Sequence, residues 1–174
     1  MTSDIEIQTA DAKDLAALQQ LYVSAFPDED LFPLVSNLLD GTAPTLSLMA
    51  MSGGGPVGHV IFIHCTVEPG GNTAALLGPL CVMPARQKGG IGSALVRAGF
   101  EDLKAQVSKI MVLGDPQYYG RFGFKPDRLV ETPCPIPVEW KDAWQSVRLD
   151  DGSETGPGRL TVPDAWKDPS LWSA

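Results

Sequence analysis

Residues 74–113 constrain the fold of this chain more than any other segment. An apolar run from Ala74 to Met83 leads into a glycine-rich loop, then into a helical pattern from about Ile91 to Val107, and then into a second apolar run at 109–113. A strand, a helix and a strand in this order form a βαβ unit, which requires a parallel pair of strands. Because the first run is apolar on both faces, we expect it to lie in the centre of the sheet.

The residues before this unit predict two helices and a series of strands joined by tight turns. Asp11 is placed to cap a helix whose apolar positions follow three-and-four spacing until Pro27 ends it. Alternating apolar residues and glycine-rich turns indicate the strands. The predicted strands are at 5–7, 45–50, 57–67 and 74–83, and the second predicted helix is at 31–39.

The length of 174 residues predicts a single domain over 1–174. We expect its core at about 5–130, in the α/β class (a mixed α+β sheet), with a central mixed β-sheet flanked by helices. Residues 131–174 are rich in proline and tryptophan and predict an irregular extension, with one helix near 138–144. We expect this extension to pack on the core through its tryptophans, which are Trp140, Trp144, Trp166 and Trp172.

Charge and cysteine content exclude several classes of function. The net charge is −8, from 13 basic and 21 acidic residues, and no two basic residues are adjacent, so we expect no nucleic-acid partner. An acidic surface suits a cationic substrate, and solubility accounts for the same charge equally well. We see no secretory leader, no membrane-spanning stretch and no metal-ligand spacing among Cys65, Cys81 and Cys134, which predicts a cytoplasmic protein with reduced thiols and no metal.

The loop at 84–92 stands where the central strand becomes a helix. Its glycines let the backbone approach an anion, and the N–H groups of the first helical turn point towards the same place. Arg86 and Lys88 add positive charge at the rim. A tight turn without a ligand is the alternative. No Lys-Ser or Lys-Thr follows the glycines, so the loop is not a Walker loop, and their order does not fit a Rossmann fingerprint.

The loop resembles the acyl-CoA loop of the GNAT N-acetyltransferases, whose pattern is Gln/Arg-x-x-Gly-x-Gly/Ala. Gln87, Gly90 and Gly92 match this pattern, and the segment 118–124 (YYGRFGF) is similar to the family's Phe-Tyr-x-x-x-Gly-Phe segment. The resemblance covers about residues 5–130. Segments 78–80 and 113–116, and more weakly 163–166, resemble a bacterial subgroup of the family. The resemblance to the family implies a sheet that splays beside the loop-bearing strand. It also implies direct transfer of an acetyl group from acetyl-CoA to a primary amine of a small molecule or peptide in a ternary complex.

The resemblance also implies site residues. Main-chain groups of Leu80, Cys81 and Val82 would contact the pantetheine arm, with the Val82 N–H polarising the thioester carbonyl. Tyr119 would be the general acid, because a phenol with a pKa near ~10 stays protonated to donate to a thiolate whose conjugate acid has a pKa near ~8.5. The pyrophosphate would be held by main-chain N–H groups of Gln87, Lys88, Gly89, Gly90, Ile91, Gly92 and Ser93.

Two points in this assignment stay open. A core aromatic with a hydrogen-bonded hydroxyl is the alternative for Tyr119. Many family members carry an Asn about six residues before the tyrosine, whereas here Gly114-Asp115-Pro116 leads almost directly into Tyr118, so the helix must begin later.

The general base is unassigned, and other functions stay in view. Because burial would raise the thiol pKa of Cys81, an acyl-cysteine mechanism is disfavoured. A non-catalytic acyl-CoA-binding sensor or interaction module is the main alternative, and a nucleotide-handling enzyme on a similar loop is a third. The acceptor, the acyl length and the oligomeric state, including a homodimer, are left open. For the general base, a chain of water molecules would serve, and the candidate side chains are Asp28, Glu29, Asp30, His59 and His64. We interpret His64 as structural.

Overall fold

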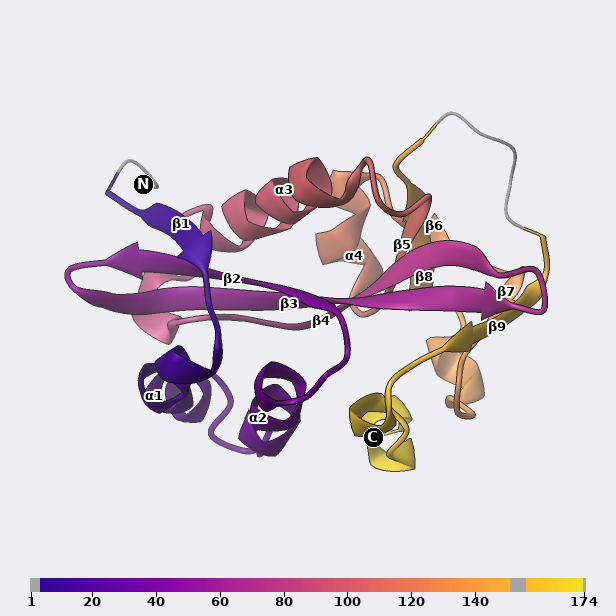
Figure 1. Cartoon of the computed structure of the whole chain (residues 1–174). Coiled ribbons are helices and arrows are strands. Elements are labelled where there is room, and N and C mark those ends of the chain that lie inside the picture. The colour runs from indigo at the N-terminus through magenta and orange to yellow at the C-terminus, as the bar shows by residue number, and fades with distance from the viewer. Residues whose placement is uncertain (1–3, 151–155, 174) are drawn as a thin grey trace. The chain divides into compact units, whose positions relative to one another are not determined.

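The computed structural model describes residues 4–150 and 156–173 (Figure 1). The chain divides into two compact units. The first unit takes the described residues up to Phe62 together with Gly78–Asp102. The second takes Ile63–Leu77 and the described residues from Leu103 onward. Two long strands, β3 (Gly55–Glu68) and β4 (Asn72–Val82), run through both units. The single-domain organisation stays a prediction.

The first unit confirms the predicted order of helices and strands. β1 (Glu6–Thr9) pairs antiparallel with β2 (Thr45–Ser52), which leads into β3. Helices α1 (Leu15–Ala25) and α2 (Phe32–Asp40) cover one face of these strands, and α3 (Ile91–Leu103) covers the other (Figure 1).

Two helix ends in this unit differ from the prediction. Asp11 accepts a hydrogen bond from the Lys13 N–H, and so caps a short 3₁₀ turn (Ala12–Asp14) that leads into α1 rather than α1 itself. Helix α3 ends at Leu103, four residues before the predicted end at Val107.

Helix α3 packs closely on β3 because two glycines lie at their contact. A Cβ at Gly58 would stand 2.8 Å from a side-chain carbon of Ile91, and one at Gly99 would stand 2.1 Å from the ring of Phe62. The start of α3, which carries the glycine-rich loop, is therefore fixed against the strand below it. The buried apolar side chains of this unit include Leu18, Leu21, Val35, Leu48, Val60, Ile61, Phe62, Ile91 and Leu95.

The second unit contains the predicted parallel pair. β4 pairs parallel with β5 (Lys109–Leu113) through Ala74–Leu76, and this pairing ends at Leu76 although β4 continues to Val82. β8 (Trp144–Arg148) pairs antiparallel with β5 along its whole length, and β6 (Lys125–Pro126) pairs with β8. β9 (Gly158–Thr161) pairs antiparallel with β3 and parallel with β7 (Val130–Glu131). Each unit thus contributes helices and strands to a mixed α/β fold.

The expectation of an irregular extension with a helix near 138–144 is wrong. Residues 138–140 form one 3₁₀ turn, and Trp144 begins strand β8. Pro135 and Pro137 leave too few residues for a helix before that strand, whose main chain takes up the free edge of β5. The remaining short helices are α4 (Pro116–Tyr119) and 3₁₀ turns at Pro84–Arg86, Gly120–Phe122, Asp164–Trp166 and Pro169–Trp172.

Tryptophans pack on one another near the end of the chain within the second unit, and the packing of this segment on the core stays a prediction. Trp172 is fully buried and packs edge-to-face against Trp144 and Trp166, with ring centroids 5.7 and 5.6 Å away. No helix in the described part of the chain combines the length and the apolar character that a membrane span needs.

A buried ion pair joins β5 to the segment after β6. The Lys109 ammonium lies 3.1 Å from Oδ2 of Asp127, and both side chains are almost fully buried. Burial alone would raise the pKa of Asp127, but hydrogen bonds from the N–H groups of Val130 and Leu129, from the Ser146 hydroxyl and from Lys109 lower it below its ordinary value. Asp127 is therefore ionised in the folded protein at neutral pH.

We expect Asp127→Asn to lower the free energy of unfolding by about 3 kcal/mol, because it leaves the buried Lys109 ammonium without its counter-charge. Urea denaturation at pH 7 measures this. Asp142→Asn is the control, because it removes an exposed ion pair with Arg128 and should cost less than about 1 kcal/mol. Equal losses for the two variants would contradict this account of the buried pair.

Candidate functional site

The loop between β4 and α3 has an unusual backbone. Lys88 has a φ of 66° and Gly90 a φ of 88°, so two left-handed residues stand with one residue between them. Lys88 is the one non-glycine residue with positive φ among those described. Such a conformation costs energy in an L-residue and is often retained where function needs it. Turns of this kind direct successive N–H groups towards one concavity that suits an anion.

The main-chain N–H groups of this loop have few acceptors. The Gln87 N–H donates to the Pro84 carbonyl at 3.3 Å, and the next donor along the chain is Ala94, which bonds to the Gly90 carbonyl at 3.0 Å. Within the described residues, the N–H groups of 88–93 have no acceptor. The last three of them belong to the first turn of α3, where the helix dipole is positive. The loop therefore offers a row of donors to an anion.

The side chains next to the loop hold it in shape. Arg86 donates to both carboxylate oxygens of Asp4 at 3.1 Å and to the Ser52 hydroxyl at 3.0 Å. Its charge is thus already matched, contrary to the expectation that it adds free positive charge at the rim, and Lys88 is the exposed cation that remains there. The Gln87 side chain donates to the Val82 carbonyl at 3.2 Å and closes the loop onto the end of β4.

The end of β4 presents alternating environments. Cys81 is buried, whereas Leu80 and Val82 on either side of it are half-buried. Burial raises the pKa of the Cys81 thiol to about 12. Cys81 is therefore a neutral thiol at physiological pH, in line with the sequence argument against an acyl-cysteine.

Tyr119, in the second unit, ends helix α4. Its ring packs edge-to-face on Phe124 and on Tyr118, with ring centroids 5.7 and 5.0 Å apart. No hydrogen bond joins its hydroxyl to any described residue. Burial, and to a lesser extent Tyr118, raises the pKa of Tyr119 well above its usual value. The alternative of a core tyrosine with a hydrogen-bonded hydroxyl is thus not what the structure shows, because the ring is packed while the hydroxyl has no protein partner.

Gly114 leaves open the space that the Tyr119 ring occupies. A Cβ at Gly114 would stand 2.4 Å from Cε2 of that ring. Two hydrogen bonds hold the main chain of Gly114. Its N–H donates to the carbonyl of Ala143, the residue before strand β8, at 3.0 Å, and the side chain of Gln145 in β8 donates to its carbonyl at 3.1 Å. The strand that sequence reasoning missed therefore positions the tyrosine it singled out. As expected, the helix begins only at Pro116.

A buried chain of polar groups crosses the first unit. The Tyr22 hydroxyl lies 2.7 Å from Nδ1 of His59, and the Ser47 hydroxyl lies 2.8 Å from its Nε2. His59 is fully buried, and this burial lowers its pKa to about 3. A neutral imidazole has one donor and one acceptor, and both are used here. His59 was a candidate general base, and this environment makes it a structural residue instead.

The other base candidates lie in a different setting. A cavity of about 330 Å³ opens where α1 ends and α2 begins, with apolar walls that include Phe26 and Phe32. Asp28, Glu29 and Asp30 also line it, and all three are exposed. This cavity combines aromatic surface with negative charge, a combination that suits a cation with an apolar body. His64 is half-buried on β3.

We expect the His59 ring to stay neutral between pH 8 and pH 5 in NMR titrations of the folded protein, whereas an exposed histidine titrates near pH ~6.5. Below about pH 6.5 the unfolded chain binds a proton at His59 that the folded chain does not, so the free energy of unfolding falls as the pH falls. The loss attributed to His59 is at most about 1.4 kcal/mol per pH unit. A His59 ring that titrates near pH ~6.5 would contradict this interpretation.

Comparisons with known proteins agree on one family. The family model of the acetyltransferase (GNAT) family matches residues 15–124. The uncharacterized N-acetyltransferase YjhQ of Escherichia coli (strain K12) is 35% identical over 164 residues, which cover 88% of this chain and 91% of YjhQ.

Two solved structures resemble the chain over nearly its whole length. The GNAT family N-acetyltransferase YhbS from Escherichia coli, in complex with CoA, has a TM-score of 0.85 at 24% identity and covers 95% of this chain and 93% of its own. A GNAT family acetyltransferase from Brucella melitensis, in complex with acetyl-CoA, has a TM-score of 0.76 at 28% identity and covers 93% of this chain and 97% of its own. The similarity therefore includes the strands after residue 124, where the family model ends.

Proposed function

Because the chain belongs to the acetyltransferase (GNAT) family, we propose that it transfers an acetyl group from acetyl-CoA to a primary amine of a small molecule or peptide. The observation that carries the proposal is the loop at 88–93, where left-handed backbone at Lys88 and Gly90 leaves successive N–H groups without a protein acceptor. CoA and acetyl-CoA in the two similar structures are the precedent for the ligand.

Acetyl-CoA binds first through its diphosphate in this proposal. The N–H groups of Lys88, Gly89, Gly90, Ile91, Gly92 and Ser93 surround the negative charge, with the positive end of the α3 dipole behind them. Gln87, whose own N–H donates to the Pro84 carbonyl, closes the loop through its side chain. Main-chain groups of Leu80, Cys81 and Val82 contact the pantetheine arm. The Val82 N–H polarises the thioester carbonyl, where negative charge develops during attack.

The transfer then proceeds in a single complex without an acyl-enzyme. The neutral amine nitrogen attacks the thioester carbon, the carbon–sulfur bond breaks, and the amine gives up a proton to solvent. The Tyr119 hydroxyl donates its proton to the departing thiolate, and the phenolate that remains regains a proton from solvent. Its raised pKa keeps the phenol protonated at neutral pH, so the proton is in place when the thiolate leaves. The buried Cys81 thiol supports direct transfer for the opposite reason, because it is not a thiolate.

The acidic cavity at the α1–α2 junction supports an amine as the acceptor. An ammonium group entering it meets Asp28, Glu29 and Asp30 beside aromatic walls. An amine with a pKa near ~10.4 must still lose its proton before attack, at a cost of about 4.6 kcal/mol at pH 7. We assign no side chain to that step, and a chain of water molecules serves it in this proposal.

We expect Tyr119→Phe to lower kcat for acetyl-CoA-dependent acetylation about 100-fold, because the thiolate then leaves without a proton donor. Thiol release from acetyl-CoA with a panel of amines measures kcat, and calorimetry should show CoA affinity within about twofold of the unaltered protein. Tyr118→Phe is the matched control and should keep kcat, since its ring stacks beneath Arg121 instead. An unchanged kcat in Tyr119→Phe, measured where chemistry limits turnover, would refute the acid assignment.

A further inference from the structure

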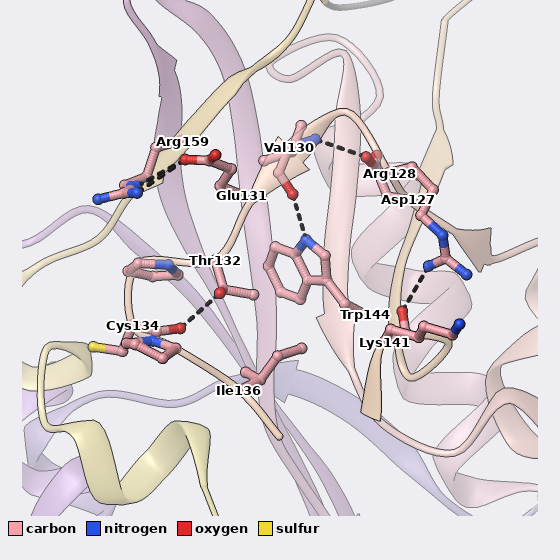
Figure 2. Close-up of a pocket in the computed structure, with 12 residues that line it drawn as sticks. Asp127, Arg128, Val130, Glu131, Thr132, Cys134, Ile136, Lys141, Trp144 and Arg159 are labelled. Carbon is pink, nitrogen blue, oxygen red and sulfur yellow. Dashed lines mark hydrogen bonds and ion pairs between the residues drawn. The ribbon is translucent and has the colours of Figure 1, made fainter. Parts of the chain in front are cut away.

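The second unit contains a cavity of about 450 Å³ that the proposed reaction does not use (Figure 2). Residues between 127 and 144, together with Arg159, line it. All of them follow residue 124, where the match to the family model ends. The volume lies in the range that small organic ligands occupy in proteins.

The inner wall of this cavity is apolar because its polar groups are already satisfied. Nε1 of Trp144 donates to the Val130 carbonyl at 2.7 Å, and the Thr132 hydroxyl donates to the Cys134 carbonyl at 2.6 Å. These bonds also fix the segment 130–136, which contains two prolines, so little conformational freedom remains to be lost on binding. The apolar lining consists of Val130, Pro133, Pro135, Ile136 and Trp144.

The charged groups at the rim leave one cation uncompensated. Arg159 donates twice to the same carboxylate oxygen of Glu131, at 3.2 and 2.9 Å. Arg128 is paired with Asp142, and the buried Asp127 is paired with Lys109.

Lys141, on the same side of the Trp144 ring as Arg128 in Figure 2, is exposed and has no carboxylate partner among the described residues. The pocket therefore joins an apolar wall to one unmatched positive charge, on a chain whose net charge is −8. An unmatched ammonium beside apolar surface attracts an anion and repels a cation of the same shape.

We propose that this cavity binds a small organic monocarboxylate, with its hydrocarbon part against Ile136 and Trp144 and its carboxylate on the Lys141 ammonium. The proposal does not rest on acetyl transfer. It concerns binding to the second unit in the absence of acetyl-CoA, so it can fail or hold whatever the outcome of the assay on Tyr119.

Titration of the full-length protein with three ligands of equal chain length tests the proposal. The ligands are hexanoate, hexanol and hexylamine, and the readout is the NMR shift of the Ile136, Lys141 and Trp144 amides. We expect saturable shifts at these residues with hexanoate, at least about tenfold weaker binding of hexylamine, and intermediate binding of hexanol.

Two variants separate charge from shape. Lys141→Gln should bring hexanoate affinity down to that of hexanol, and Ile136→Trp should fill the cavity and abolish binding of both. Lys13→Gln is the control, because it removes another exposed lysine, from the first unit, and should leave hexanoate affinity unchanged.

Three results would overturn the proposal. They are the absence of saturable shifts at the lining residues with hexanoate, equal affinity for hexanoate and hexylamine, and hexanoate affinity unchanged in Lys141→Gln. If Ile136→Trp does not fold, the Lys141→Gln variant still tests the proposal. Lys141 is exposed, so its substitution disturbs no packed side chain.

Discussion

A turn that leads into a helix offers its N–H groups to an anion only where the backbone forgoes other hydrogen bonds. In this protein the left-handed conformations of Lys88 and Gly90 have that effect, and residues 88–93 keep their donors unpaired within the described chain. The neighbouring contacts make the arrangement rigid. Arg86 is tied to Asp4 and Ser52, Gln87 to the end of β4, and the start of α3 to β3 through Gly58. The proposed binding of a diphosphate depends on this preorganisation, since a flexible loop would lose much of the binding energy in becoming ordered.

Buried polar groups fix each unit in a comparable way. In the first unit, the chain from Ser47 through His59 to Tyr22 joins β2, β3 and α1 with both ring nitrogens satisfied. In the second, Asp127 gathers two main-chain donors, a hydroxyl and the Lys109 ammonium. Such networks favour one arrangement because an unpaired member would be costly. They lie beside the functional elements: His59 stands on the strand that supports α3, and strand β8, which carries Ser146, also holds Gly114 beneath Tyr119.

Sequence reasoning recovered what is encoded locally. The βαβ unit, the central position of β4 and the glycine loop follow from periodicity and glycine placement, and the structure contains all three. Strand β8 was missed because a short strand after a proline-rich segment carries a weak local signal, and its partner β5 lies far away in the sequence. The matched charge of Arg86 and the pairing of His59 with Tyr22 were also out of reach, since each depends on contacts between residues distant in sequence. The motif that singled out Tyr119 likewise says nothing of what supports its ring, because only the fold brings Gln145 to Gly114.

Calorimetry with fragments of the coenzyme tests the central claim most directly. If the main-chain N–H groups around Gly90 hold the diphosphate, CoA and dephospho-CoA, which both carry it, should bind with measurable heat, and pantetheine, which lacks it, should bind at least about 100-fold more weakly. Gly90→Val, which forces a branched side chain into a left-handed position, should weaken binding of the first two ligands and leave that of pantetheine unchanged. Absence of binding heat with CoA, or equal affinity for CoA and pantetheine, would contradict the account.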